Sequence, residues 1–170
     1  MVHAGHVVRK QSAGLLLHRY EGDAVEVLLA HMGGPFWMKK DEAAWSIPKG
    51  EYQPGDDPLA AARREFEEEL GSPPPNAEYR ALGSLRAPGG KVITIWAVEG
   101  DFDASTAVSN TFEIEWPPRS GKLMSFPEID RAAWFTLDVA RSKLVKSQGP
   151  FLDRLVADSS WGDHVGDHIL

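Results

Sequence analysis

Three glutamates, Glu65, Glu68 and Glu69, stand at positions i, i+3 and i+4 of a segment rich in helix-forming residues. On an α-helix this spacing places all three carboxylates on one face within a single turn. Like charges so close together destabilise a helix unless a cation lies against them. Mg²⁺ prefers oxygen ligands, and it commonly binds one or two carboxylates together with the phosphates of a substrate. The cluster therefore favours a magnesium site, whereas a lone run of such residues is more often a solvated acidic surface.

The helix that would carry these carboxylates has clear start and stop signals. Asp57 suits the N-cap, Pro58 the first helical position, and Gly71 the residue that ends the helix. Residues 59–70 between them are mostly strong helix formers. Residues 72–75, S-P-P-P, cannot continue a helix. The sequence therefore predicts a rigid helix that ends just after the acidic cluster.

Apolar and alternating patterns predict the other elements of the chain. Strands are expected at residues 12–18, 25–32, 44–47, 79–86, 91–99, 110–116 and 131–135, and further helices at 137–145 and 149–158. The first two strands form a predicted hairpin, the segment from Gly50 to Gly55 is expected to be irregular, and residues 91–99 are apolar on both faces, as in a central strand. We expect one layered α/β domain over residues 1–170, with flexible ends at 1–10 and 160–170.

Composition excludes several classes of protein. The chain has 170 residues, no cysteine, 25 acidic and 18 basic side chains, and a net charge of −7. Without cysteine there is no disulfide framework, thiolate zinc site or cysteine nucleophile. No apolar run is long enough to span a bilayer and residues 1–10 lack the apolar core of a secretory signal, so we expect a cytoplasmic protein with no membrane partner. The acidic balance argues against a nucleic-acid partner, and residues 51–70 alone, with seven acids and two bases, contribute −5.

Residues 50–72 closely resemble the signature box of the Nudix hydrolases, G-x5-E-x7-R-E-U-x-E-E-x-G-U, in which U is a bulky aliphatic residue. Six of its nine specified positions match: Gly50, Arg64, Glu65, Glu68, Glu69 and Gly71. The other three positions hold Asp56 in place of glutamate, Phe66 and Ser72. Asp56 is the departure that matters, because in the family this carboxylate supports the metal shell or the attacking water, and a shorter side chain there either keeps the role or reduces activity.

The resemblance implies the Nudix fold, a mixed β-sheet sandwiched between α-helices, and a Mg²⁺-dependent hydrolase in which Mn²⁺ is a possible substitute. By resemblance, the metal ligands would be Glu65, Glu68, Glu69 and a backbone carbonyl near Lys49 or Gly50, Arg64 would orient Glu65, and Asp56 would assist catalysis. The general base stays open between a helix glutamate and a later acid such as Glu113 or Glu115. The substrate would be a small phosphorylated nucleotide, cleaved at a phosphoanhydride bond of a nucleoside diphosphate linked to another moiety.

Basic loop residues are candidates for contacts with the substrate's phosphates: Lys39, Lys49, Arg119 and Lys122, followed by Lys40 and Lys91. Each alone is more often a solvated surface residue, but Lys49 lies beside Gly50 at the start of the box. Residues 45–50, W-S-I-P-K-G, resemble a stretch of Nudix enzymes that act on dinucleoside polyphosphates and diphosphoinositol phosphates. Pro88, 16 residues after Ser72, instead lies near a proline associated with ADP-ribose pyrophosphatases.

A dinucleoside polyphosphate is therefore the leading expected substrate, followed by ADP-ribose, a nucleotide sugar or a nucleoside triphosphate. The substitution at Asp56 motivates one alternative, a weakly catalytic nucleotide sensor. The loop aromatics Phe36, Trp37 and Trp116 suit stacking on a base or packing in the core. The histidines near the chain ends, His3, His6, His164 and His168, are not expected to bind metal. The assembly is expected to be a monomer or a homodimer.

Overall fold

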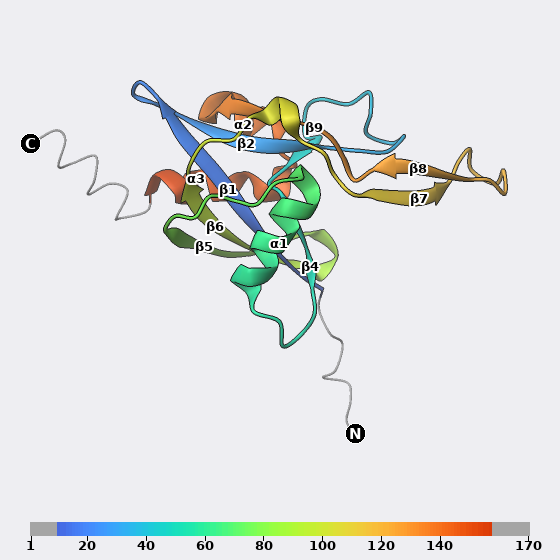
Figure 1. The fold of residues 1–170 in the computed structure, drawn as a ribbon, viewed down its shortest axis with the longest axis horizontal. Coiled ribbons are helices and arrows are strands. Elements are labelled where there is room, and N and C mark those ends of the chain that lie inside the picture. The colour runs from blue at the N-terminus through green and yellow to red at the C-terminus, as the bar shows by residue number, and fades with distance from the viewer. Residues whose placement is uncertain (1–9, 158–170) are drawn as a thin grey trace, which may run out of the picture.

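The computed structural model describes residues 10–157, where a mixed sheet carries helices on both of its faces (Figure 1). Apart from Lys10, the ends predicted to be flexible lie outside the described residues, and so do the histidines near the chain ends. The main sheet has seven strands: β1 (Gln11–Glu21), β2 (Ala24–Met32), β3 (Trp45–Ser46), β4 (Lys49–Tyr52), β5 (Tyr79–Arg86), β6 (Val92–Glu99) and β9 (Ile129–Thr136).

The strand order places the predicted central strand inside the sheet. The path runs β3-β2-β1-β6-β5, with β4 paired to β1 and β9 paired to β2. β1 and β6 run parallel, and the other pairs are antiparallel. The predicted hairpin of β1 and β2 is confirmed, and β6 lies between β1 and β5, as its two apolar faces predict.

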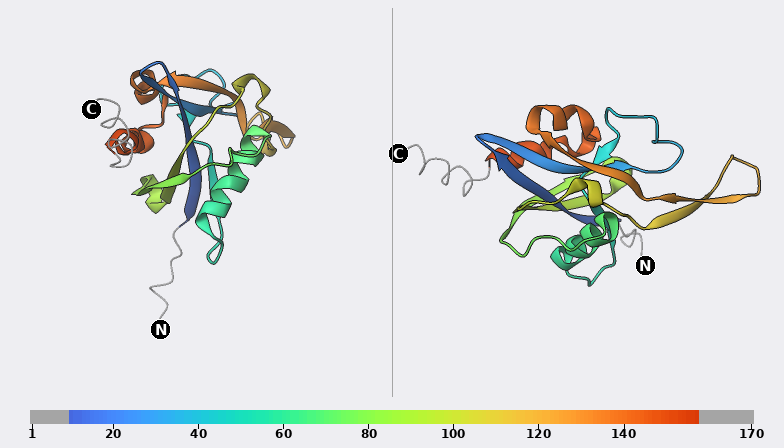
Figure 2. Two further views of the ribbon diagram at one scale, coloured as in Figure 1. Left: turned by 60° about the vertical axis from the view of Figure 1, so that its left-hand side comes forward. Right: turned by 45° about the horizontal axis from the view of Figure 1, so that its top comes forward.

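The core has two halves because the central strands are covered on both faces. Leu16 of β1 joins an apolar cluster with α2 (Leu137–Lys143) and α3 (Gly149–Ala157). Its neighbours Leu15 and Leu17 join a second cluster under α1 (Pro58–Leu70). Successive side chains of a strand point to opposite faces, so a continuous apolar run needs two covering layers. Figure 2 shows α1 on one side of the sheet and α2 and α3 on the other, which confirms the predicted mixed sheet between helices.

Helix α1 begins and ends where the sequence predicts. The Asp57 side chain accepts a hydrogen bond from the Ala60 N–H at 2.9 Å, and Pro58 occupies the first turn. Gly71 ends the helix with a φ of 84°, and its N–H donates to the Glu67 carbonyl at 2.7 Å. The face toward the sheet is apolar and buried: Ala61, Ala62, Phe66 and Leu70. None of the helices within residues 10–157 combines the length and apolarity needed to cross a membrane.

One expectation about the strands was wrong, and one strand was not predicted. The segment after Gly50, expected to be irregular, forms β4 as far as Tyr52. Pairing with β1 stabilises this strand, which the local sequence pattern does not predict. The strand predicted at residues 110–116 is confirmed as β7 (Thr111–Glu115), which lies outside the main sheet and pairs with β8 (Leu123–Pro127). No strand was expected at β8. The β7–β8 hairpin projects from the body of the protein (Figure 1).

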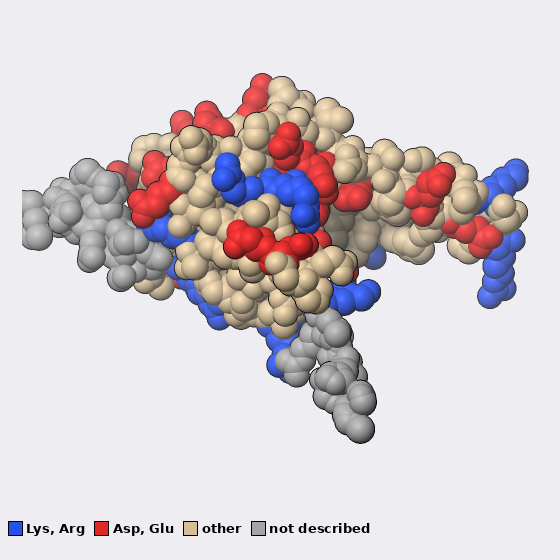
Figure 3. Space-filling view, turned by 60° about the horizontal axis from the view of Figure 1, so that its bottom comes forward, with Lys and Arg blue, Asp and Glu red and all other residues tan. Residues whose placement is uncertain are grey.

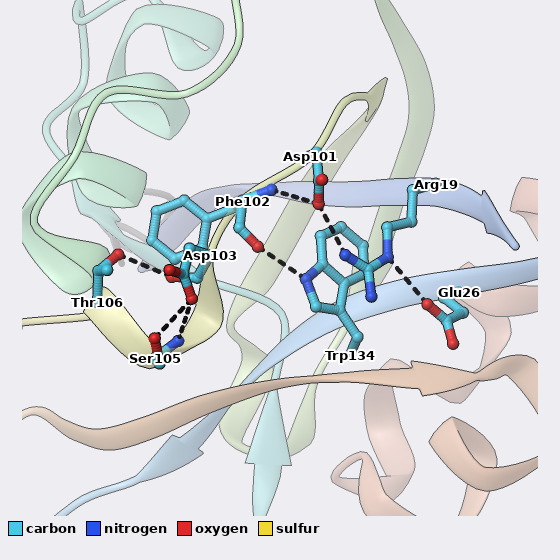
Figure 4. A network of polar contacts seen from close by, with 8 residues as sticks. All are labelled: Arg19, Glu26, Asp101, Phe102, Asp103, Ser105, Thr106 and Trp134. Carbon is cyan, nitrogen blue, oxygen red and sulfur yellow. Dashed lines mark hydrogen bonds and ion pairs between the residues drawn. The ribbon is translucent and has the colours of Figure 1, made fainter.

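Residues 100–110 connect β6 to this hairpin, and we call them the α1 strap. Arg19 holds its first turn by an ion pair with Asp101 at 2.7 Å, and the guanidinium lies 4.0 Å from the ring centre of Trp134. The Trp134 indole N–H donates to the Phe102 carbonyl at 2.9 Å (Figure 4). The Phe102 ring then packs edge to face against Phe66 of α1. The strap therefore ties α1 to β1 and β9.

Asp57→Ala should lower the free energy of unfolding by about 1 kcal/mol, because it removes the side chain that caps α1. Asp57→Asn keeps the acceptor and should stay close to the wild type. Urea unfolding followed by circular dichroism measures both. Equal stabilities for the two variants would show that the cap contributes nothing.

Candidate active site

The carboxylate of Glu65 is packed against a glycine of β4. A Cβ atom on Gly50 would lie 1.8 Å from Glu65 Oε1, so any side chain at this position would displace the carboxylate. Gly50 is held in place by its pairing with Ala13 of β1. The side chain of Glu65 is only 13% exposed. The helix and β4 therefore hold this carboxylate close to backbone atoms and largely away from water.

Arg64 contacts two of the three helix glutamates. Its Nη2 lies 3.4 Å from Glu65 Oε2, and its Nε lies 3.9 Å from Glu68 Oε1. The guanidinium is about half exposed, so these contacts contribute little to the stability of the fold. The arrangement suits the orienting role predicted for Arg64, and that role stays a prediction.

Glu69 has the most strongly perturbed carboxyl group of the site. Burial raises its pKa to about 8, although the charge of Lys49 and a hydrogen bond from the Lys49 backbone oppose the rise. Burial likewise lowers the pKa of Lys49, with the charge of Glu69 opposing it. Burial first, and then the charge of Glu68, raise the pKa of Glu65. The site therefore holds carboxylates that lack enough compensating positive charge.

A fourth carboxylate, Glu128, joins this group and was missed by the sequence analysis. It lies between β8 and β9. Partial burial and the charge of Glu68 raise its own pKa, and its charge in turn raises the pKa of Glu65 and of Glu69. No spacing in the sequence signals this residue, because the preceding strand was not predicted and its neighbours lie far away along the chain.

Backbone hydrogen bonds fix Glu128 beside the helix. The N–H of Asn110, at the end of the α1 strap, donates to the Glu68 carbonyl at 3.0 Å, and its carbonyl accepts from the Glu128 N–H at 2.8 Å. The Glu128 carbonyl accepts from the Gly33 N–H at 2.9 Å. The Ser109 hydroxyl adds a contact by accepting from the Ile129 N–H at 3.1 Å. Figure 3 shows acidic and basic side chains together on the face of the molecule that carries α1.

Comparison with known proteins decides the family. The family model described as NUDIX domain matches residues 8–155 of the chain. The chain belongs to the Nudix family. The family and fold predicted from residues 50–72 are therefore confirmed, and Nudix membership supports the prediction of a pyrophosphohydrolase. No curated protein matches the chain.

Solved structures with the Nudix fold resemble the protein over most of its length. A C. elegans Ap4A hydrolase in a binary complex is 22% identical with a TM-score of 0.57, over 87% of this chain and 96% of that one. The NUDIX domain of Shewanella oneidensis NrtR, complexed with ADP ribose, is 15% identical with a TM-score of 0.61, over 89% and 88%. The M. smegmatis Nudix hydrolase RenU is 22% identical with a TM-score of 0.57, over 89% and 86%. At these identities the likeness concerns the fold.

Nudix hydrolases generally use divalent metal ions, and the donor chemistry of this site fits such an ion. Glu65, Glu68, Glu69 and Glu128 offer hard oxygen donors. Burial and mutual repulsion raise the pKa values of Glu65, Glu69 and Glu128, and a bound cation would stabilise the charged form of these groups. Within residues 10–157, however, no three His, Cys, Asp or Glu side chains already converge closely enough to hold a metal. Glu68 Oε1 also lies 3.9 Å from Arg64 Nε, so a bound ion would share this carboxylate with the guanidinium.

Several other predicted site residues lie apart from the carboxylates. The Asp56 side chain accepts a hydrogen bond from the Gln53 N–H at 3.1 Å, so its described contact orders the turn before α1, and a catalytic role for it stays a prediction. Glu113 is exposed on β7, and Glu115 accepts from the N–H groups of Arg119 and Gly121 at 3.2 and 3.0 Å. These hydrogen bonds hold the hairpin tip.

The predicted phosphate-binding residues are likewise dispersed. Lys49 is the one that lies with the carboxylates. Arg119 and Lys122 lie at the tip of the β7–β8 hairpin, and Lys39 is exposed in the loop after β2. Lys91 forms an ion pair with Glu51 at 3.5 Å, and the Lys40 Nζ lies 5.2 Å from the ring centre of Trp37.

Gly50→Ala should abolish most activity while the fold survives, because the new Cβ would push the Glu65 carboxylate out of place. Positioned catalytic groups contribute about 10² to 10⁴ in rate, so a loss in that range is expected. The matched control is Gly149→Ala, since nothing lies within 4 Å of a Cβ at that glycine and its φ of −50° suits alanine. Hydrolysis assays with circular dichroism compare the two, and a fully active Gly50→Ala enzyme would contradict the assignment.

The metal-free protein should lose stability as the pH rises toward 8. The pKa of Glu69 rises from its ordinary 4.5 to about 8 on folding, so between these values the folded protein binds a proton that the unfolded chain has released. Urea unfolding in EDTA should therefore give a free energy of unfolding that falls across this range, and Glu69→Gln should flatten the slope. A stability that rises with pH in this window, or a slope unchanged by the substitution, would contradict the burial of Glu69.

Proposed function

We propose that this Nudix protein is a Mg²⁺-dependent hydrolase that cleaves a phosphoanhydride bond in a nucleoside diphosphate linked to another moiety. A dinucleoside polyphosphate is the leading substrate, and Mn²⁺ is the second candidate metal. The observation that carries the proposal is the group of Glu65, Glu68, Glu69 and Glu128, whose charges are held together beside Lys49. Repulsion of this kind is what a divalent cation and the phosphates it binds would relieve.

The contacts of the site residues support a proposed role for each of them. Glu65, Glu68 and Glu69 would hold the metal together with a backbone carbonyl near Gly50, and Arg64 would keep Glu65 and Glu68 oriented. When bound, the metal would neutralise charge on the phosphate oxygens and lower the pKa of a bound water. Lys49 supplies a positive charge next to Glu69, at the side of the site formed by β4.

The proton of the attacking water needs a nearby carboxylate. Glu128 joins the helix glutamates as a candidate, because its charge acts on Glu65 and Glu69. Glu113 and Glu115 are weaker candidates, because they lie on the projecting hairpin and Glu115 is engaged at its tip. A base whose pKa lies near the working pH transfers protons most efficiently, which favours the carboxyl groups whose pKa is raised.

The choice of substrate rests on two supports. Residues 45–50 resemble a stretch of Nudix enzymes that act on dinucleoside polyphosphates, and the fold is similar to that of a C. elegans Ap4A hydrolase. The NUDIX domain of NrtR, solved with ADP ribose, supports ADP-ribose as an alternative substrate. Nucleotide sugars and nucleoside triphosphates are the further alternatives. We further propose that residues 1–170 form a single domain that acts on small nucleotides in the cytoplasm, without a nucleic-acid or membrane partner.

A weakly catalytic nucleotide sensor is the second candidate function. The observation that favours it is the hydrogen bond that the Asp56 side chain accepts from the Gln53 N–H. Asp56 replaces the usual box glutamate, and none of its described contacts joins it to the helix carboxylates. Such a protein would bind the same ligands without turnover.

Glu68→Gln and Glu69→Gln should each reduce hydrolysis by orders of magnitude, since each loses a metal ligand or a positioned base. The assay uses diadenosine polyphosphates, ADP-ribose, diphosphoinositol phosphates and nucleoside triphosphates with Mg²⁺. Glu67→Gln is the matched control, because Glu67 is exposed on the same helix and should leave the rate unchanged. Turnover that survives both changes within about threefold would refute the metal-ligand assignment, and binding without turnover across the panel would favour the sensor.

A further inference from the structure

Gln148 is one of the few buried polar side chains among residues 10–157, and the proposed mechanism gives it no role. It ends the 3₁₀ turn Lys146–Gln148, directly before α3, and is only 2% exposed. Its side-chain oxygen accepts a hydrogen bond from the Ile47 N–H at 2.9 Å, and its side-chain N–H donates to the Ser46 hydroxyl at 3.0 Å. Burial of an amide opposes folding unless such partners satisfy it. An apolar side chain could fill the same space, so these two hydrogen bonds are what the amide contributes.

Both contacts lie where the chain crosses from one strand of the sheet to another. Strand β3 pairs with β2 and β4 pairs with β1, so Ile47 and Pro48 lie between two ladders. The Pro48 carbonyl accepts a hydrogen bond from the Leu15 N–H of β1 at 3.1 Å. The Ile47 N–H donates to Gln148, and the Ile47 carbonyl accepts from the Ser46 hydroxyl at 2.8 Å. The two side chains therefore supply the hydrogen bonds that a neighbouring strand would otherwise give to Ile47.

The crossing leads directly to the acidic group of the site. One residue, Pro48, separates Ile47 from Lys49, whose backbone N–H donates to the Glu69 carboxylate. The proline ring fixes the φ angle of Pro48. A Cβ atom on Gly14 of β1 would lie 2.4 Å from the Pro48 carbonyl oxygen, so the crossing runs tightly against this strand. The segment has little room to move, and a displacement of Ile47 would therefore be passed on to Lys49.

We propose that Gln148 is a positioning residue of the active site, which sets where the Lys49 backbone N–H meets Glu69. It acts through the sheet, because it directly precedes α3 on one side while Glu69 lies on α1 on the other (Figure 2). The residue after Lys49 is Gly50, against which Glu65 packs, so the same hold reaches a second carboxylate. The effect on catalysis rests on the proposed function, whereas the link from Gln148 to Lys49 can be measured without metal or substrate.

Amide NMR of the metal-free full chain tests this link directly. Gln148→Leu keeps a side chain of similar size and removes both hydrogen bonds. The Ile47 amide proton should then move upfield because it loses its acceptor, and the Lys49 amide proton should follow because its contact with Glu69 lengthens. A Lys49 amide proton that keeps its wild-type position would overturn the proposal, whether or not that of Ile47 moves.

Two further variants keep the test sharp. Gln148→Glu retains an oxygen opposite the Ile47 N–H, so the Lys49 amide proton should stay near its wild-type position, and a displacement as large as that in Gln148→Leu would contradict the role of this contact. If Gln148→Leu does not fold, Ser46→Ala takes its place, since it removes the hydroxyl that binds the Ile47 carbonyl. A Lys49 amide proton unmoved in Ser46→Ala would then overturn the proposal.

The matched control for a general loss of stability is Arg154→Met. Arg154 lies on α3, and its side chain donates to two backbone carbonyls of β5 at 2.9 and 3.1 Å. None of the site residues lies on β5. The variant should lower the melting temperature and leave the Lys49 amide proton in place. A displacement as large as that in Gln148→Leu would show that the fold merely loosens and would overturn the proposal.

The same variants test the consequence for the site. Gln148→Leu should lower both kcat for diadenosine tetraphosphate and the Mg²⁺ affinity measured by calorimetry by about tenfold, since residues that orient metal ligands contribute at least that much. Arg154→Met should keep the wild-type values despite its lower melting temperature. Wild-type values in Gln148→Leu would overturn the proposal. If the wild type hydrolyses no nucleotide, the proposed function fails, and the Lys49 amide proton still decides the role of Gln148.

Discussion

The site depends on the removal of carboxylates from water when α1 packs on the sheet. Glu65 and Glu69 each precede an apolar residue, Phe66 and Leu70, that is fully buried in the core, so the helix cannot dock without bringing the glutamates along. Burial of apolar side chains of this size stabilises the fold by about 1.5–3 kcal/mol each, whereas burial of a charged carboxylate opposes folding. The raised pKa values of Glu65 and Glu69 reflect this cost of burying a charge, and a bound cation would offset it.

The surrounding elements hold the carboxylates in these buried positions. Gly50 leaves room for the Glu65 carboxylate, and its strand is held by β1. The α1 strap bonds to the last carbonyls of the helix and to the backbone of Glu128, so the helix and the hairpin base cannot shift independently. Lys49 lies close enough to Glu69 for the two charges to interact, but burial lowers the pKa of Lys49 and so disfavours its charged form. One packing arrangement therefore fixes the distances among all four carboxylates.

The sequence predicts what is determined locally. Helix α1 could be placed because Asp57, Pro58 and Gly71 act on neighbouring backbone groups, and the three helix glutamates share a face by helical geometry alone. β4, β8 and Glu128 could not be placed, because each depends on partners far along the chain: Glu128 lies 60 residues beyond Glu68, and Asn110 bridges their backbones. Arg119 and Lys122 looked like phosphate ligands by residue type, but the departure of β7 from the main sheet carries them away from the carboxylates.

Carboxyl carbon NMR of Glu69, titrated with and without Mg²⁺, tests the central claim most directly. Without metal we predict that this carboxyl group titrates near a pKa of about 8. Saturating Mg²⁺ should move the titration well below neutral pH, because the bound cation favours the ionised form. A Glu69 that titrates at its ordinary value without metal, or whose titration Mg²⁺ leaves unchanged, would contradict the view that the helix carboxylates form the metal site.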